Sequence, residues 1–111
     1  MKNDLLISVV IPTLNNRKQF LLEAIQSVEN QSYLPYEIII INNGEGKVQV
    51  DHSLLKIRQY KITFKSGVAM ARNFGANEAK TKYVAFLDDD DFWGEHYLKY
   101  MKDVIEKNQP D

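Results

Sequence analysis

Four consecutive aspartates, Asp88 to Asp91, are the side chains of this chain best suited to chemistry. Neighbouring carboxylates about 6 Å apart repel each other by roughly 3 kcal/mol at an effective dielectric constant near 20. A hard divalent cation such as Mg²⁺ or Mn²⁺ relieves this repulsion, because it prefers oxygen ligands and completes its shell with water and phosphates. The run therefore predicts either a metal site or a solvated acidic loop in which Asp91 caps the next helix.

The backbone conformation of this run decides which carboxylates lie together. Side chains alternate along an extended segment, so Asp88 and Asp90 are expected on one side and Asp89 and Asp91 on the other. Two aspartates can then bind a metal while another accepts hydrogen bonds from the sugar hydroxyls of a nucleotide.

The aspartates directly follow Tyr83–Leu87, an apolar segment with the length and composition of a buried strand. Three other short apolar segments, rich in β-branched residues, predict strands of the same kind. They are Leu5–Ile11, which Pro12 ends, Glu37–Ile41 and Ile57–Phe64.

Helical patterns separate these strands. Leu21, Ala24, Ile25 and Val28 have the spacing of one helix face, and an apolar face recurs in the last helix. Between them, residues 67–76 predict a helix of mostly small residues. Residues 48–55 fit either a short helix or a loop. The three expected helices run from an Asn16 cap to before Pro35, from a Ser66 cap to about Lys80, and from about Glu95 to Lys107.

Alternating strands and helices predict an α/β fold, a mainly parallel sheet with helices on both faces. Ligands of such sheets bind beyond the carboxyl ends of the strands, where the strand order reverses. Polar loops follow three of the strands at this end, so we expect the loops to converge on one cleft. These loops are Pro12–Arg17, Asn42–Gly44 and Asp88–Asp91.

Composition restricts the possible partners. The chain has 111 residues, enough for a single domain, with 14 Lys and Arg against 15 Asp and Glu. A net charge of -1 gives no field that would attract nucleic acid or an anionic membrane. Without cysteine, a signal peptide or an apolar stretch of about 20 residues, the chain is expected to be cytoplasmic. Any peripheral contact with the inner membrane face would use parts beyond Asp111.

The first strand and the loop after it, Ile7–Asn15, resemble the opening SVIIPTYN motif of family 2 glycosyltransferases of the GT-A fold. Three further segments match this family in order: residues 37–44, 67–75 and 83–93. The resemblance implies a Rossmann-like nucleotide-diphospho-sugar transferase fold, truncated at its C-terminal side. It also implies a metal-dependent, inverting, hexosyltransferase-like enzyme. Such an enzyme would transfer a sugar from a nucleotide-diphosphate donor to a glycan or lipid-linked acceptor, in the synthesis of cell-surface polysaccharide or other glycans.

The resemblance also implies residue roles. It places the nucleoside pocket after the first strand and recognition of the base in the turn after the second strand. The helix expected from Ser66 to about Lys80 would contact the diphosphate. The aspartates would bind Mg²⁺ or Mn²⁺ and contact the ribose. Asp90 is the best single candidate for the metal ligand, together with Asp88, and Arg72 is alternatively an ordinary surface residue. The expected substrate-binding residues are Pro12, Thr13, Asn15, Asn42, Asn43, Arg72, Asp88 and Asp89.

The chain departs from the family pattern at Asn42-Asn43, where the family usually has Asp-Asp before Gly. An aspartate accepts a hydrogen bond from a uracil N–H. An asparagine carbonyl can do the same, but its amide can also donate. Uridine diphosphate sugars are therefore the favoured donors, with other nucleotides left open.

The general base of inverting family members usually comes from the acceptor-binding half of the fold, C-terminal to the aspartates. This chain ends at Asp111, 20 residues after Asp91, so we expect an N-terminal portion, inactive alone, whose base lies beyond Asp111. The alternative is a nucleotide- or metal-binding module without transferase activity. A receiver or phosphatase-like domain would need an aspartate directly after the first strand, where this chain has Pro12-Thr13.

Overall fold

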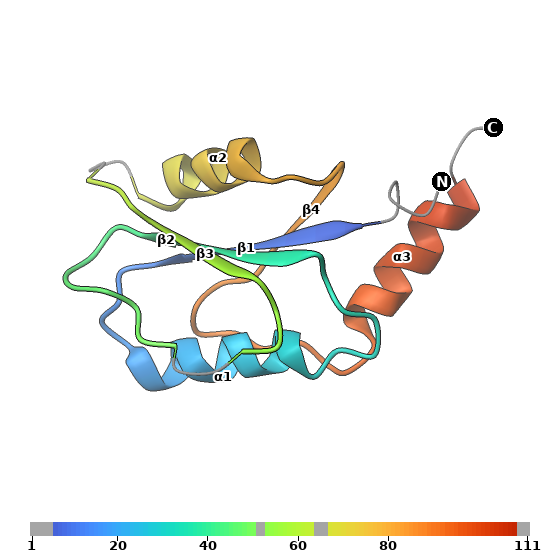
Figure 1. The fold of residues 1–111 in the computed structure, drawn as a ribbon, viewed down its shortest axis with the longest axis horizontal. Coiled ribbons are helices and arrows are strands. Elements are labelled where there is room, and N and C mark those ends of the chain that lie inside the picture. The colour runs from blue at the N-terminus through green and yellow to red at the C-terminus, as the bar shows by residue number, and fades with distance from the viewer. Residues whose placement is uncertain (1–5, 51–52, 64–66, 109–111) are drawn as a thin grey trace.

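The computed structural model describes residues 6–50, 53–63 and 67–108. Within them, four parallel strands form one sheet in the order β3-β2-β1-β4 (Figure 1). The elements are β1 (Ile7–Thr13), α1 (Lys18–Glu29), β2 (Glu37–Asn42), β3 (Ile57–Lys61), α2 (Val68–Glu78), β4 (Tyr83–Phe86) and α3 (Tyr97–Asn108). The expected α/β fold with a parallel sheet is confirmed.

The strand order reverses next to β1. The chain builds outward from β1 through β2 to β3, and then returns to the other side of β1 as β4. Right-handed crossovers made in opposite directions place their helices on opposite faces. Figure 1 shows α2 on one face of the sheet and α1 on the other. The reversal brings the loops after β1 and β4 together at the carboxyl ends of the strands.

The two central strands supply most of the core. Every residue of β1 and β2 is buried, and successive residues alternate between the two faces. Ile7, Val9 and Ile11 pack with α1 and α3, whereas Val10 packs with Ala71 of α2. This two-sided burial explains the nearly continuous apolar sequences of both strands.

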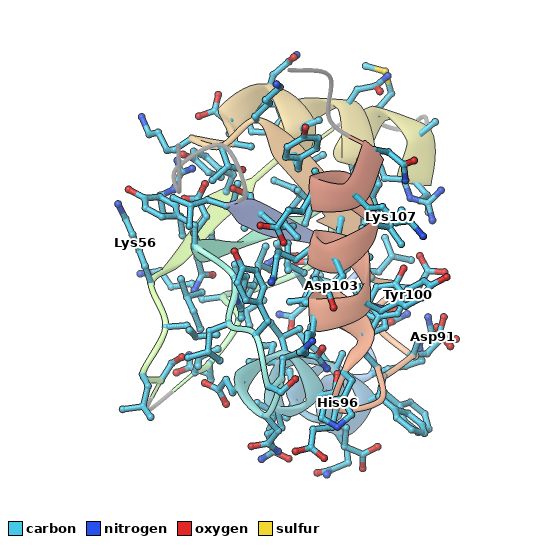
Figure 2. All side chains as sticks on the ribbon, turned by 90° about the vertical axis from the view of Figure 1, so that its right-hand side faces the viewer. Lys56, Asp91, His96, Tyr100, Asp103 and Lys107 are labelled. Atoms are coloured by element: carbon cyan, nitrogen blue, oxygen red, sulfur yellow. The ribbon has the colours of Figure 1, made fainter. Side chains whose placement is uncertain are left out.

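Gln31 connects the end of α1 to the start of α3. Its side chain is buried; its amide donates to the carbonyls of Ser27 and Gly94, and its oxygen accepts from the backbone of Leu98. Leu98 itself is fully buried. Beyond this anchor α3 runs along one end of the molecule, as Figure 2 shows.

The expectation that Pro12 ends the first strand is wrong, because β1 continues to Thr13. Backbone groups of Ile7 and Thr13 bond toward β2 and those of Val10 toward β4. Alternation then turns the missing N–H of Pro12 toward β4, beyond the last paired residue of that strand. The last bond of the β1–β4 pair runs from the Leu87 N–H to the Val10 carbonyl, and the next would need the N–H that Pro12 lacks. Pairing with β4 therefore stops here, while β1 stays paired with β2 as far as Thr13.

Other boundaries also differ from expectation. The third strand stops at Lys61, since β2 ends at Asn42 and offers no partner beyond it. The described part of residues 48–55 is an irregular loop. Arg17, not Asn16, occupies the N-cap position of α1, and no side chain caps this helix. The expected ends at Leu5 and Phe64 and the cap at Ser66 lie outside the described residues.

Among the helices of the described ranges, none is both long and apolar enough to cross a membrane.

Candidate functional site

A hydrogen bond joins the loops that follow β1 and β4. Thr13 Oγ1 donates to Asp89 Oδ2 at 2.7 Å and accepts from the backbone N–H of Asn15 at 2.9 Å. The single hydroxyl proton of Thr13 is therefore directed at Asp89. Because both side chains are buried, this contact is protected from competition by water.

The four aspartates do not form an extended segment. The backbone N–H of Asp91 donates to the carbonyl of Asp88 at 3.1 Å, which closes a turn. Asp88, Asp90 and Asp91 consequently offer carboxylate oxygens that all lie within 4.8 Å of one another, while Asp89 points inward. The expected separation of Asp88 and Asp90 from Asp89 is confirmed, but the pairing of Asp91 with Asp89 is wrong, because the chain turns.

The alternative role of Asp91 as a helix cap is also wrong. The helix α3 begins only at Tyr97, after a turn in which the Tyr97 N–H bonds to Gly94. Figure 2 shows Asp91 at the side of the molecule, apart from His96. His96 follows the aspartates closely along the chain, but its Nδ1 lies 2.7 Å from Ser32 Oγ, and it is not one of the three clustered metal-ligand candidates of the described residues.

Two arginines contact the acidic run. Arg17 reaches Asp89 Oδ1 at 3.0 Å and Asp90 Oδ2 at 3.2 Å, and Arg72 reaches Asp88 Oδ1 at 2.9 Å. They offset two of the four carboxylates, so two formal negative charges remain. Clustered carboxylate oxygens with this residual charge fit one Mg²⁺ or Mn²⁺ ion, whereas softer metals prefer nitrogen or sulfur ligands.

Arg72 has donor capacity that the protein does not use. Its Nε is buried and has no hydrogen-bond partner within the described residues. The guanidinium lies 5.9 Å from the centre of the Phe86 ring, which holds it over the end of β4. A planar guanidinium with a free donor suits a phosphate.

The turn after β2 uses its own amide side chains. Asn42 Nδ2 donates to the Gly46 carbonyl at 2.9 Å, and Asn42 Oδ1 accepts from the Gly44 N–H at 2.8 Å. The side chain of Asn42 is thus committed to the turn and buried. Lys61 Nζ donates to the Gly44 carbonyl from the end of β3.

Asn15 ties this turn to the loop after β1. It has φ 56°, a left-handed conformation that asparagine tolerates, and its amide donates to the carbonyls of Glu45 at 2.7 Å and Lys47 at 3.3 Å. The two loops also touch at Gly44, where an added Cβ would lie 1.6 Å from the Leu14 carbonyl oxygen. Asn15 therefore holds the loop after β1 against the turn after β2.

A cleft of about 160 Å³ opens between these loops and α2. This volume is below the roughly 300 Å³ of a typical small-molecule site, so it suits one part of a nucleotide. A hollow of about 680 Å³ against α1 has none of the four aspartates in its wall. The smaller cleft is the better candidate, because its wall includes Arg17, which pairs with Asp89 and Asp90. Its lining comprises Pro12, Thr13, Leu14, Arg17, Asn43, Gly67, Val68 and Ala71.

The structure separates the sequence-predicted residues into three groups. Pro12, Thr13 and Asn43 line the cleft; Arg72, Asp88 and Asp90 lie at the charged cluster; and the side chains of Asn15, Asn42 and Asp89 are engaged in internal contacts.

Sequence reasoning did not select Arg17, which lines the cleft and pairs with two aspartates. Its only signal was a cation in the loop after β1, opposite an acidic loop expected at the same edge of the sheet.

The chain matches the family model described as "Glycosyl transferase family 2" over residues 8–111. YwdF, an uncharacterized glycosyltransferase of Bacillus subtilis, is 39% identical over 103 residues, which cover 90% of this chain and 38% of YwdF. WcaA of Escherichia coli, a putative colanic acid biosynthesis glycosyl transferase, is 34% identical over 99 residues, 84% of this chain and 35% of WcaA. The first four curated relatives are covered over only 16 to 38% of their length.

Solved structures of Staphylococcus aureus TarS share the fold. The complex of TarS residues 1–349 with UDP superposes with a TM-score of 0.72 at 23% identity, over 92% of this chain and 32% of that one. The complex with UDP-GlcNAc gives 0.72 at 22% identity, over 92% of this chain and 31% of that one. At this level of identity the likeness establishes a common fold.

Proposed function

Because the chain belongs to glycosyl transferase family 2, we propose that it binds the nucleotide-diphosphate sugar from which a longer enzyme transfers the sugar. The arrangement at the carboxyl ends of the strands carries this proposal. There, a cleft with Pro12, Thr13 and Asn43 in its wall adjoins three clustered carboxylates and two guanidinium groups.

In the proposed complex the nucleoside occupies this cleft. Pro12 and Ala71 form apolar parts of the wall, and Asn43 is a polar residue of the same wall, on the side proposed for the base. Asn42 shapes the turn that carries Asn43, since its own amide is engaged. A uridine diphosphate sugar is the favoured donor, and the solved complexes of TarS with UDP and UDP-GlcNAc support that choice.

The diphosphate of the donor would lie at the charged end of the cleft. Arg72 is 41% exposed there, and a planar guanidinium favours a contact with a phosphate oxygen. Asp90 and Asp88, together with Asp91, would hold Mg²⁺ or Mn²⁺. A bound divalent ion supplies positive charge to a leaving diphosphate.

The acceptor and the stereochemistry belong to the longer protein. We propose an inverting, hexosyltransferase-like reaction on a glycan or lipid-linked acceptor. A place in cell-surface polysaccharide synthesis is supported by the likeness to WcaA, a putative colanic acid biosynthesis glycosyl transferase. Since the four aspartates serve the donor side, another segment would supply the general base. The proposed location is the cytoplasm, with contact to the inner membrane face through other segments.

The proposal is tested by calorimetry of the chain with uridine, guanosine and thymidine diphosphates, each with and without Mn²⁺. We expect uridine diphosphate to bind most tightly and Mn²⁺ to strengthen its binding. If none of the three diphosphates binds under either condition, the proposal is wrong.

A nucleotide- or metal-binding module without transferase activity would give the same calorimetry. The two functions differ in turnover. We expect the longer protein to release the diphosphate from its donor sugar when an acceptor is supplied, and a binding module would release none.

A further inference from the structure

Asp89 differs from its neighbours in burial and in partners. Its side chain is 8% exposed, against 48% for Asp88 and 45% for Asp90. One carboxylate oxygen accepts from Thr13 and the other from Arg17. A donor or a metal has little access to this nearly buried carboxylate, and the two partners already stabilise its charge.

Arg17 links this buried carboxylate to an exposed one. One guanidinium nitrogen lies 3.0 Å from Asp89 Oδ1, and the other lies 3.2 Å from Asp90 Oδ2. The guanidinium is planar and its nitrogens have a fixed separation, so fixing one end also restricts the other. Asp90 Oδ1 remains free of hydrogen bonds to the described part of the chain, which leaves it available as a ligand.

We propose that Arg17 and Asp89 are positioning residues that hold the carboxylate of Asp90 in place for the metal. This inference rests on the proposed function and deepens it, because it replaces the expected donor contact of Asp89 with a supporting role. In the chain of contacts, Thr13 fixes Asp89, Asp89 fixes Arg17, and Arg17 fixes Asp90.

Two costs explain why such support is useful. An exposed aspartate must lose rotational freedom to bind a metal in one geometry, and it must do so beside other carboxylates that repel it. Arg17 lowers both costs before the metal arrives. Replacing groups that orient metal ligands typically weakens metal binding by about 10- to 100-fold.

A positioning role and a purely electrostatic role predict opposite results. If Arg17 acted only through its charge, removing it would strengthen metal binding, since a nearby cation repels the metal. If Arg17 orients Asp90, removing it weakens metal binding. Arg17→Lys separates the two further, because lysine keeps the charge but cannot bridge two carboxylates with a rigid fork.

The experiment measures the Mn²⁺ concentration that half-saturates uridine diphosphate binding to the chain. We expect Arg17→Lys, Arg17→Gln and Asp89→Asn each to raise it roughly tenfold or more. The double variant Arg17→Gln with Asp89→Asn should be no worse than Arg17→Gln alone, because the pair acts as one unit. Lys18→Gln removes the neighbouring exposed cation of α1 and should leave the value unchanged.

Each outcome decides between explanations. Wild-type Mn²⁺ dependence in Arg17→Lys, or tighter Mn²⁺ binding in Arg17→Gln, would overturn the positioning role and leave the proposed function intact. If uridine diphosphate binds the wild-type chain with the same affinity with and without Mn²⁺, the proposed metal site itself is wrong. Thermal unfolding of each variant completes the test: because Arg17 is 47% exposed, loss of folding in Arg17→Lys would also contradict the proposal.

Discussion

At the scale of single residues, the arginine on α2 is the one whose role can be separated from that of the metal. Arg72 contacts Asp88 and keeps a buried donor without a partner in the described residues. A diphosphate supplies oxygen acceptors for the exposed part of this guanidinium, and a nucleoside without phosphates does not. Its contribution should therefore appear only with phosphorylated ligands.

We predict that Arg72→Gln weakens uridine diphosphate binding by about tenfold, because a hydrogen bond to a charged group contributes about 1.5 kcal/mol or more. Binding of uridine itself should not change. Calorimetry with the two ligands measures the difference, and Lys82→Gln, at the opposite end of the sheet, is the control. An equal loss for uridine would show that Arg72 shapes the nucleoside pocket instead.

A second residue-scale feature lies away from the cleft. Glu37, at the start of β2, is fully buried, and it accepts hydrogen bonds from Ser8, from Arg58 and from the backbone N–H of Lys80. Burial alone would raise the pKa of Glu37, but these hydrogen bonds and the charge of Arg58 outweigh it and lower the pKa below 4.5. The ionised form is therefore part of the folded state.

This lowered pKa gives a pH prediction. As the pH falls, Glu37 is protonated at a higher pH in the unfolded chain than in the folded chain. The stabilisation of the fold by ionised Glu37 is therefore present above pH 4.5 and is lost as the pH falls through the folded-state pKa. Glu37→Gln should cost roughly 3 kcal/mol at pH 7, since it leaves the mostly buried Arg58 unpaired, and should flatten stability against pH in the acid range.

The measurement is urea unfolding of both proteins between pH 3 and 7. Glu106→Gln, on the exposed face of α3, is the matched control and should follow the wild type. A Glu37→Gln protein with the same acid dependence as the wild type would show that other carboxylates set it.

The contrast between Asp89 and Arg17 shows what the sequence can and cannot reveal about the site. Four aspartates after an apolar strand identify the acidic loop from local pattern alone. That Asp89 is buried depends on a turn within the run and on Thr13, 76 residues earlier. The pairing with Arg17 spans a similar separation, so no local pattern could predict it.

At the scale of elements, local sequence predicts strands and helices well and their ends less well. Apolar runs identify β1 and β2 because both faces of these strands are buried. The ends depend on neighbours: β1 continues through Pro12 because β2 still pairs with Pro12 and Thr13, and β3 stops at Lys61 because β2 offers no further partner. Such limits are set by strand pairing, which local pattern does not contain.

The turn after β2 is the element on which the cleft depends most. Gly44 lies so close to the Leu14 carbonyl that an added methyl group must displace backbone. We predict that Gly44→Ala destabilises the fold by roughly 2 kcal/mol and also weakens uridine diphosphate binding, because Leu14 and Asn43 line the cleft.

Thermal unfolding and calorimetry check both effects. Gly94→Ala is the matched control, since nothing lies within 4 Å of its added Cβ, and should change stability by less than about 0.5 kcal/mol. If Gly44→Ala behaves like Gly94→Ala, the two loops do not need their close approach.

At the scale of the whole molecule, the strand order explains why distant loops form one site. The return of the chain from β3 to β4 places the acidic loop beside the loop after β1. Alternating strands and helices predicted this edge of the sheet as the ligand site, but only the structure gives the order of the strands. With α2 on the face opposite α1, the cleft lies between the β1 and β2 loops and α2.

The proposed function assigns donor binding to this chain and sugar transfer to a longer protein, and the position of the site within the chain supports this assignment. The cleft and the acidic cluster both lie within this chain, which spans only part of its curated relatives. Donor binding should therefore be measurable with the chain alone, while sugar transfer should require the longer protein.

The central claim is that Asp90 and its neighbours hold the metal on which donor binding depends. Titration of uridine diphosphate, without Mn²⁺ and at saturating Mn²⁺, into the wild type, Asp90→Ala and the control Glu106→Ala tests it most directly. The account predicts that Asp90→Ala loses the Mn²⁺-dependent part of the affinity, by roughly tenfold or more, while Glu106→Ala matches the wild type. An Asp90→Ala protein that still responds to Mn²⁺ like the wild type would contradict it.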